Sequence, residues 1–462
     1  MLRVCCKIYY SVIYMGMPSG LDARPWMEGL FLLAAVNVET RDVGHAWWKL
    51  KKWVISTMYR YFSRHAGKVD SGLVGMMDPA SVCMRILHAT ISSLSLYSQG
   101  HFLSPRVANT LLNILDEAVR KPAYWSEIQP HISQLIQHVV IPMLAFDDLD
   151  QELWDEDPEE YIRKGYDIIE DIYSPKTSAV AVLCCLCGSK KRNQLDPVMA
   201  FLAAIFQETV GEWVNTATMT QAQARKLDGA IYGVGSLASI LQKNKTYKPQ
   251  IPSLFQTFIL PTFSSPYGHV RAKACWVSSE FASALHNVSP EIFMQLLQRM
   301  QALLNDPELP VQVDAAIAMR EFFSNIDEDQ VQQYGFLQVL PSLLSKFLEL
   351  ANSVDSEGIM DTIECVVDKF GEHIGPYAFD VASALVAQFW KIVNVEDDDG
   401  DVFTDSLAGH QVLGTIATVL EAVSKSPEIL AQMEGLLFPI FDKCMGDNGM
   451  DVIEEMLDIV TQ

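Results

Sequence analysis

Apolar residues recur along most of this chain at the spacing of one face of an α-helix. Five of them share one stripe, with successive separations of four, one, three and four positions: Val107, Leu111, Leu112, Leu115 and Val119. Ser104 and Pro105 stand just before this stripe, where a helix cap and a first-turn proline are expected. Similar stripes occupy residues 132–144, 227–241, 293–304, 311–323, 340–350, 359–370, 381–392 and 412–423. Alternating strand patterns are nearly absent, so the chain is predicted to be all-α.

A short motif recurs at the start of several stripes. An Asp or Ser precedes a proline at Asp157-Pro158, Ser265-Pro266 and Asp306-Pro307, and a β-branched residue follows each proline by four positions. The second and third copies lie 41 residues apart and also align at Ala274 and Ala315. We expect the Asp or Ser to cap the second helix of a pair and the proline to open its first turn. The β-branched residues and the alanines should then face the neighbouring repeat.

The spacing of this motif indicates a repeat architecture. A period of ~40–47 residues built from helix pairs is typical of HEAT and armadillo repeats. Residues 1–462 are therefore predicted to form a single α-solenoid of roughly 10–11 helix pairs. The length agrees with this prediction, because 462 residues exceed what one compact core usually holds.

The charge balance narrows the choice of partner. The chain has 34 Lys and Arg against 57 Asp and Glu, a formal net charge of −23 at pH 7. Such an excess repels phosphate backbones, so a basic protein partner is expected and direct nucleic-acid binding is not. The most apolar internal run, residues 178–187, is about half of the ~20 residues that a membrane helix needs, so no membrane insertion is expected.

One acidic segment interrupts the helical pattern near the C-terminal end. Six acids fall within ten residues around Gly400, and residues 394–406 are predicted to form a solvated loop between two helices. The predicted partner-binding residues are these six acids: Glu396, Asp397, Asp398, Asp399, Asp401 and Asp405. They could capture Lys- and Arg-rich segments by charge attraction, or the loop could be an inert linker.

A second acidic segment, residues 147–160, holds nine acids in 14 positions. Asp155, Glu156 and Asp157 are weaker candidates for partner binding. The favoured interpretation is structural, with Asp155 or Asp157 capping the next helix, because acids at a helix N-terminus are favourable to its dipole. Trp154 and Tyr161 are expected to pack between repeats.

Three further motifs have both a functional and a structural interpretation, and the structural one is favoured for each. Trp47, Trp48 and Trp53, with lysines between them, could stack on nucleic acid but fit inter-repeat packing better. The cysteines in residues 184–187 lack the spacing of a zinc site. Residues 233–238 match GxGxxA without a preceding strand, so the glycines are expected to allow close helix contact. No catalytic motif, metal ligand or cofactor-binding residue is predicted, and the chain is not expected to be an enzyme.

Four segments together resemble one protein family. They are Glu152-Leu-Trp-Asp-Glu-Asp-Pro-Glu-Glu-Tyr161, which continues to residue 175, then Trp47-Trp-Lys-Leu-Lys-Lys-Trp53, Phe263-Ser-Ser-Pro-Tyr-Gly-His-Val-Arg-Ala-Lys-Ala-Cys-Trp276 and Val366-Val-Asp-Lys-Phe-Gly371. The sequences of these segments resemble those of the importin-7/8 branch of the importin-β superfamily, and are nearest to plant and green-algal members. The resemblance runs from about Lys7 to the end of the chain.

The resemblance implies a HEAT-repeat superhelix that acts as a nuclear transport receptor. Such a receptor carries protein cargo into the nucleus, releases it on binding Ran-GTP, contacts Phe-Gly nucleoporins, and shuttles between cytoplasm and nucleus. The loop at residues 394–406 lies where the family carries an acidic insertion implicated in contacts with basic cargo or Ran.

Two departures from the family pattern leave alternatives open. Family members are much longer, and neither their N-terminal Ran-binding domain nor their C-terminal repeats have a counterpart here, so an internal segment is expected. A HEAT scaffold for cytosolic complexes, without a transport cycle, is the first alternative to the transport function. An enzyme with a helical active site of unrecognised type is the second.

Overall fold

Every regular element in the described part of the chain is a helix. The computed structural model describes residues 1–18, 20–67, 74–166, 172–216, 218–327, 330–331, 335–354, 356–393, 407–444 and 453–461. Within these ranges the only strand-like pairing is an isolated bridge between Val74 and Met77. The predicted all-α class is confirmed.

The helices fall into two compact units. Unit 1 comprises Met1–Asp147 and Asp167–Lys248, and unit 2 comprises Asp148–Tyr166 and Pro249–Gln462. The longer helices of unit 1 are α1 (Leu2–Met15), α2 (Arg24–Ala35), α3 (Ala46–His65), α4 (Pro79–Ser98), α5 (Pro105–Arg120), α12 (Pro175–Gly188), α13 (Leu195–Thr216) and α14 (Gln221–Ser236). The shorter ones are α6 (Trp125–Ile128), α7 (Ile132–Leu135), α8 (Ile141–Leu144) and α15 (Ala238–Lys243).

In unit 2 the insertion Asp148–Tyr166 forms two helices, and the remaining helices form pairs. The described helices are α9 (Asp148–Glu156), α10 (Pro158–Tyr166), α16 (Ile251–Leu254), α17 (Leu260–Thr262), α18 (Gly268–Glu280), α19 (Ala282–Val288), α20 (Pro290–Leu303), α21 (Leu309–Asn325), α23 (Phe336–Ser353), α24 (Glu357–Ile374), α25 (Ala378–Val393), α26 (Leu407–Ala422), α27 (Pro427–Cys444) and α28 (Ile453–Thr461).

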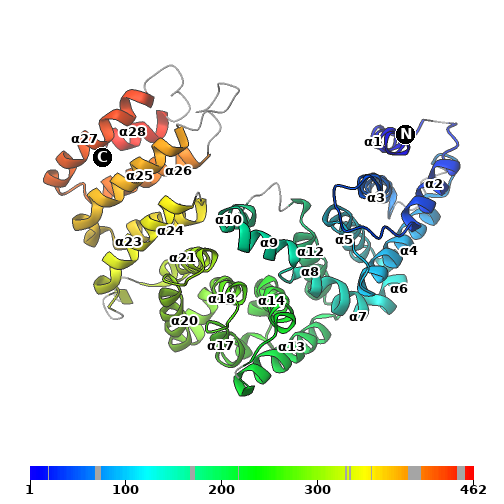
Figure 1. The fold of residues 1–462 in the computed structure, drawn as a ribbon, viewed down its shortest axis with the longest axis horizontal. Coiled ribbons are helices and arrows are strands. Elements are labelled where there is room, and N and C mark those ends of the chain that lie inside the picture. Colours follow the sequence, from blue (N-terminus) through cyan, green and yellow to red (C-terminus); the bar gives the residue numbers. More distant parts are fainter. Residues whose placement is uncertain are drawn as a thin grey trace. The chain divides into compact units, whose positions relative to one another are not determined.

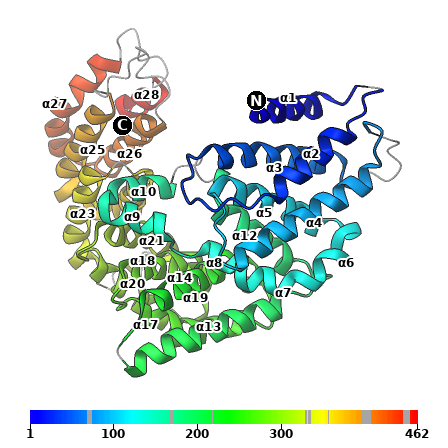
Figure 2. The ribbon, with the colours of Figure 1, turned by 45° about the vertical axis from the view of Figure 1, so that its right-hand side comes forward.

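Successive second helices of the pairs stack side by side within each unit. In unit 1, α1 packs on α3, α3 on α5, and α5 on α12, while α2 and α4 form a second row (Figures 1 and 2). In unit 2, α18, α21, α24, α26 and α28 form one row, and α23, α25 and α27 form the other. Each helix therefore contacts mainly its neighbours, which is the contact pattern of a solenoid.

The amphipathic pattern explains why these helices stack. In α5 the five residues of the predicted stripe are each at most 1% exposed. Pro105 occupies the first turn, as predicted, whereas the Ser104 side chain makes no capping hydrogen bond. Burying a large aliphatic side chain is worth about 1.5–3 kcal/mol, so the stripe is enough to hold α5 between α3 and α12.

Two of the first helices of the pairs contain a π-helical turn that the sequence pattern does not predict. The π turns are Ile136–Val140 and Phe255–Ile259. Each is followed by an Ile or Leu and then a proline, at Pro142 and Pro261. Because a proline has no N–H and clashes with the carbonyl one turn earlier, a wider turn before it lets the helix continue.

The recurring Asp/Ser-Pro motif behaves as predicted in its first copy. The helix α10 begins at Pro158, and the backbone N–H of Glu160 donates to Asp157 Oδ1 at 3.0 Å. Asp157 is therefore the cap of this helix, and Pro158 opens its first turn.

The capping prediction is wrong for the other two copies. Here α18 and α21 begin at Gly268 and Leu309, two residues beyond the motif prolines. Ser265 Oγ and Asp306 Oδ1 instead accept from the backbone N–H two residues on, at 3.2 and 3.0 Å, and so close a tight turn before the helix. The β-branched residues and alanines of these two copies are fully buried, as expected.

Candidate partner-binding surfaces

The main predicted site lies outside the described residues. All six acids of the predicted loop fall in the undescribed range 394–406: Glu396, Asp397, Asp398, Asp399, Asp401 and Asp405. Their assignment as partner-binding residues therefore remains a prediction. The two helices that flank this range, α25 and α26, pack against each other in unit 2.

The weaker candidates Asp155, Glu156 and Asp157 are exposed at the junction of α9 and α10. Asp157 caps α10, and both carboxylate oxygens of Asp155 accept from the side-chain amide of Gln151 at 3.0 Å. Two of the three acids thus have local structural roles. Glu156 remains exposed in the last turn of α9.

Trp154 fixes the α9–α10 hairpin to the repeat helices of unit 2. Its ring is 7% exposed and meets Tyr161 edge to face, with centroids 4.9 Å apart. Its Nε1 donates to Glu308 Oε2 at 2.6 Å, and α10 packs on α21. The prediction that these two aromatic residues are packing residues is confirmed.

Glu308 belongs to a buried ionic cluster that the sequence did not reveal. Arg271 on α18 donates to both carboxylate oxygens of Asp306, at 2.7 and 2.8 Å, and to Glu308 at 2.9 Å. It also donates to the carbonyl oxygen of Ser265 at 2.8 Å. Only 10% of the Arg271 side chain and 5% of the Asp306 side chain are exposed. Charge-assisted bidentate bonds of this kind hold two groups in one fixed geometry.

The cluster also explains one glycine. A side chain at Gly268 would collide with the Glu308 carboxylate, so the first turn of α18 approaches Glu308 with no room for a methyl group. The cluster therefore connects α18, the turn before α21, and the α9–α10 hairpin through Trp154.

Unit 2 also carries a ladder of acids on consecutive stacked helices. Glu280 on α18, Glu321 on α21 and Glu364 on α24 are 41 and 43 residues apart, one repeat period each. Partial burial raises the pKa of Glu280, and the Glu321 carboxylate raises it further. Burial likewise raises the pKa of Glu364, with a further contribution from Asp361 and Asp368. Arg320 on α21 already pairs with Asp361 and lies 3.7 Å from the Glu321 carboxylate, so a cationic ligand along this row would add to a partial neutralisation that is present in the chain itself.

Sequence reasoning missed this acid ladder, although its signal was present. The three glutamates do not form a run, since each lies in a different helix. Their register becomes visible only when the 41-residue spacing already found at the Asp/Ser-Pro motif is extended along the helices.

The two units differ sharply in charge. Unit 1 contains 23 Lys and Arg against 17 Asp and Glu, a net charge of +6. Unit 2 contains 11 Lys and Arg against 40 Asp and Glu, a net charge of −29. The negative charge of the whole chain, −23, therefore comes entirely from unit 2.

The tryptophan cluster of α3 is divided between two faces. Trp48 is 2% exposed, donates to the Thr40 carbonyl at 2.7 Å and meets Phe102 edge to face. This residue packs between helices, as predicted. Trp53 instead meets Tyr10 of α1 edge to face, with centroids 5.6 Å apart, and lines a cavity. Trp47 is 43% exposed.

The cysteine and glycine motifs are parts of the helix packing. Burial raises the pKa of the thiols of Cys184, Cys185 and Cys187, that of Cys187 to about 12. In α14, Gly233 lies where a Cβ would be 3.2 Å from Ile141 Cδ1, and Gly229 where it would be 2.9 Å from the Ile141 carbonyl. The glycines permit close contact between α14 and α8, as predicted.

None of the described helices is both long enough and apolar enough to cross a lipid bilayer.

Comparison with known proteins identifies the class of this solenoid. The family model described as Cse1 matches residues 107–319. The chain is 34% identical to the "Importin beta-like SAD2 homolog" of Arabidopsis thaliana over 100% of its own length and 45% of that protein. It is 28% identical to human "Importin-8" over 98% of its length and 44% of that protein. The chain thus spans less than half the length of these curated relatives.

The solved structures agree on the fold. The karyopherin Kap121p, solved bound to RanGTP, matches with a TM-score of 0.53 at 14% sequence identity, over 97% of this chain and 45% of that protein. The stacked helix pairs, together with this structural match, define a HEAT-repeat α-solenoid, the fold that Kap121p also has. The chain belongs to the importin-β superfamily, in the branch of importin-7 and importin-8.

Proposed function

We propose that this chain acts in a nuclear transport receptor that carries protein cargo into the nucleus and releases it on binding Ran-GTP. The observation that carries the proposal is the 34% identity, along the whole chain, with a protein named as importin-β-like. The proposal includes Ran-GTP, basic cargo proteins and Phe-Gly nucleoporins as partners, shuttling between cytoplasm and nucleus, and no catalytic role.

The stacked helices support a mechanism of partner exchange. Each described helix contacts mainly its neighbours within a unit, so small changes at many contacts add up to a change in curvature. Two partners that favour different curvatures then compete without sharing a binding site. Kap121p, which shares this fold, has been solved with RanGTP and with the SUMO protease Ulp1p. Our proposal is that RanGTP is a partner of this chain as well.

Basic cargo is proposed to bind unit 2 through two sets of acids. One is the predicted loop at residues 394–406, and the other is the acid ladder Glu280, Glu321 and Glu364. A net charge of −29 on unit 2 attracts basic segments over a distance of about a Debye length. The ladder then spaces carboxylates along stacked helices, and an extended basic peptide could meet several of them in turn.

The test is to exchange this chain for the matching segment of the Arabidopsis relative and to follow cargo in two assays. In a binding assay, Ran locked in its GTP form should displace a basic cargo protein from the chimera, whereas Ran in its GDP form should not. In permeabilised cells, the chimera should accumulate that cargo in nuclei. A folded chimera that binds cargo but ignores Ran-GTP would support the alternative of a scaffold without a transport cycle.

A further inference from the structure

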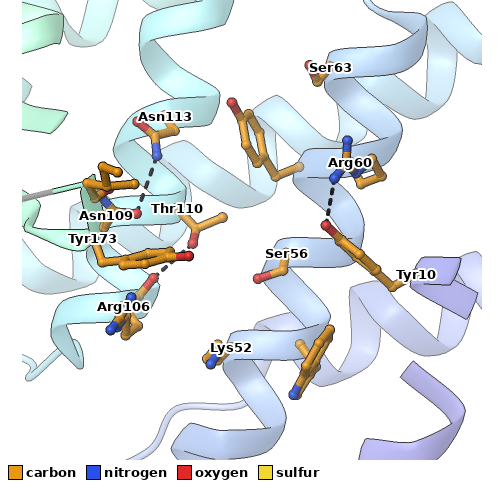
Figure 3. A pocket seen from close by; sticks show the side chains of 13 residues that line it. Tyr10, Lys52, Ser56, Arg60, Ser63, Arg106, Asn109, Thr110, Asn113 and Tyr173 are labelled. Atoms are coloured by element: carbon orange, nitrogen blue, oxygen red, sulfur yellow. Dashed lines mark hydrogen bonds between the residues drawn. The ribbon is translucent and has the colours of Figure 1, made fainter. Parts of the chain in front are cut away.

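Unit 1 contains a cavity whose chemistry is opposite to that of the acid ladder. It has a volume of about 640 Å³ and lies where α1, α3 and α5 meet the segment that enters α12. Its described lining residues include three cations and no acid: Lys52 and Arg60 from α3, and Arg106 from α5. Figure 3 shows Arg106 and Tyr173 on one side of this cavity and Lys52, Ser56 and Arg60 on the other. We call it the basic pocket.

The three cations of the basic pocket have no ion-pair partner among the described residues. Arg60 donates to the Tyr10 hydroxyl at 2.7 Å, and the Lys52 ammonium lies over the Trp53 ring. The two acids near the end of α5 are paired within that helix, Asp116 with Arg120 and Glu117 with Lys121. Three cations therefore face one concave surface, which is a site for an anion.

The pocket is preorganised by a buried polar cluster beneath it. Asn109 is 4% exposed and donates to the carbonyl oxygens of Ile172 and Ser174 and to Ser178 Oγ. These bonds hold the backbone next to Tyr173, whose ring lies 3.7 Å from the Arg106 guanidinium. Arg106 is thereby held in a fixed orientation, which reduces the entropy lost on binding a ligand.

The spacing of the cations excludes a single small anion as the matching ligand. Lys52 and Arg60 are eight residues apart on α3, and a helix rises 1.5 Å per residue, so their backbones are ~12 Å apart. One phosphate cannot contact all three cations. A ligand whose negative groups are spread over about a nanometre can do so, and three or four residues of an extended peptide, at ~3.3 Å each, cover that distance.

The aromatic residues distinguish a peptide from a nucleic-acid strand. Single-stranded nucleic acids bind by stacking bases on free aromatic faces. Here cations lie over three of the four described aromatic rings that line the pocket: Arg106 over Tyr173, Arg60 over Tyr10 at 5.2 Å, and Lys52 over Trp53 at 5.8 Å, which leaves only Tyr59. We propose that the basic pocket binds an acidic peptide segment of a partner protein, whose carboxylates meet Lys52, Arg60 and Arg106. This site is distinct from the acid ladder and binds a ligand of opposite charge.

The test uses fluorescence anisotropy of the whole chain with a labelled peptide in which Asp and Glu alternate with Phe and Gly. The triple variant Lys52→Gln, Arg60→Gln, Arg106→Gln should bind at least about tenfold more weakly, because each removed contact is charge-assisted. The matched control Lys190→Gln, Lys191→Gln, Lys245→Gln removes the same charge from exposed positions of unit 1 and should stay within about twofold of the parent. A peptide with Asn and Gln in place of the acids should not bind.

A second variant separates binding from folding. Lys52→Gln with Arg106→Gln leaves the Arg60–Tyr10 hydrogen bond intact, and its thermal unfolding should match that of the parent chain. It should still lose most of the peptide affinity. Equal losses in the pocket variant and the control, or no binding by the parent chain, would overturn the proposal. Tighter and equally pocket-dependent binding of a single-stranded RNA oligomer would also overturn it, in favour of a nucleic-acid site.

Discussion

Unit 1 and unit 2 each join two neighbouring stacked helices through a buried polar cluster, and the two clusters differ in charge. In unit 1, α5 meets α12 through neutral groups, with Asn109 and Asn113 bonded to Ser178. In unit 2, α18 meets the turn before α21 through the ionic cluster of Arg271, Asp306 and Glu308. We call each of these clusters a joint. Both units are stacks of helices, but the joint is neutral in unit 1 and ionic in unit 2.

The exposed surfaces differ in the same sense. Unit 1 has a net charge of +6 and a pocket lined by three cations, whereas unit 2 has a net charge of −29 and a ladder of glutamates. A stack of helix pairs leaves its surface residues free to vary, because the fold depends only on the buried stripes. One chain can thus offer surfaces for partners of opposite charge.

The largest expected effect is the loss of the ionic joint in unit 2. Arg271→Ala would leave Asp306 buried and unpaired, and breaking a buried ion pair from one side costs about 3–5 kcal/mol. The amides of α18 and α21 should therefore exchange faster than in the parent chain, which hydrogen exchange followed by mass spectrometry would measure. Amides of unit 1 should exchange as in the parent chain.

Two controls sharpen this prediction. Arg271→Met combined with Asp306→Leu removes both charges and should recover much of the protection, since a buried pair and an apolar pair of similar size are comparable in stability. Arg24→Ala in unit 1 breaks an ion pair with Asp22 in which the arginine side chain is 62% exposed, and should leave amide protection close to that of the parent chain. Equal effects of Arg271→Ala and Arg24→Ala would contradict the distinction between a buried and an exposed ion pair.

The neutral joint of unit 1 should be weaker than the ionic one. Asn109→Ala removes the amide donor that Ile172, Ser174 and Ser178 share at the entrance of α12 and leaves buried acceptors, at an expected cost of about 1–3 kcal/mol. The loss of protection should be confined to α5 and α12. Thr110→Ala, which removes only a bond to the carbonyl one turn earlier in the same helix, is the matched control and should change little.

Much of the fold could be predicted from the sequence, because it depends on local periodicity. The stripe of α5, the proline at its start and the cap at Asp157 each need only a few neighbouring residues. The π turns could not be predicted, since a Pro inside a helix pattern ordinarily indicates its end. The two motifs at Ser265 and Asp306 were misassigned as caps because their partner, Arg271, acts across two helices.

The candidate sites were harder to predict than the fold, because a local sequence pattern does not specify which helices come together. The six acids from Glu396 to Asp405 fall within ten residues and are visible in the sequence, whereas the acid ladder is distributed over three helices at one position per repeat. The basic pocket combines residues from α1, α3, α5 and the segment just before α12. Such sites follow from the stacking of helices, which no local pattern specifies.

The acid ladder should give a moderate effect on binding. The triple variant Glu280→Gln, Glu321→Gln, Glu364→Gln should bind a labelled Lys- and Arg-rich peptide about fivefold more weakly at low salt, because partly exposed charge pairs contribute little each. The difference should shrink as salt is added.

The control for the acid ladder removes three exposed acids of unit 2 from helices that do not carry the ladder, α20 and α27. Glu291→Gln on α20, with Glu428→Gln and Glu434→Gln on α27, changes the charge of unit 2 equally. If both variants lose the same affinity, the net charge rather than the ladder attracts the peptide. The triple variant of the basic pocket should bind this basic peptide as the parent chain does, or slightly better.

The smallest expected effect is a pH dependence that belongs to unit 2. Burial, Asp361 and Asp368 raise the pKa of Glu364, so the folded chain holds this proton more tightly than the unfolded chain does. Folding is therefore favoured below the ordinary glutamate pKa, and that contribution is lost as the pH rises through the raised value. Glu364→Gln keeps the neutral form at every pH, and should raise the midpoint of thermal unfolding by about 1 °C at pH 7 while leaving it unchanged near pH 4. The exposed Glu434 on α27 provides the comparison, because Glu434→Gln should leave the midpoint within error at both pH values. A gain at pH 4 as large as that at pH 7 would mean that the substituted glutamine side chain packs better, and that neither burial of the charge nor like-charge repulsion at Glu364 is the cause.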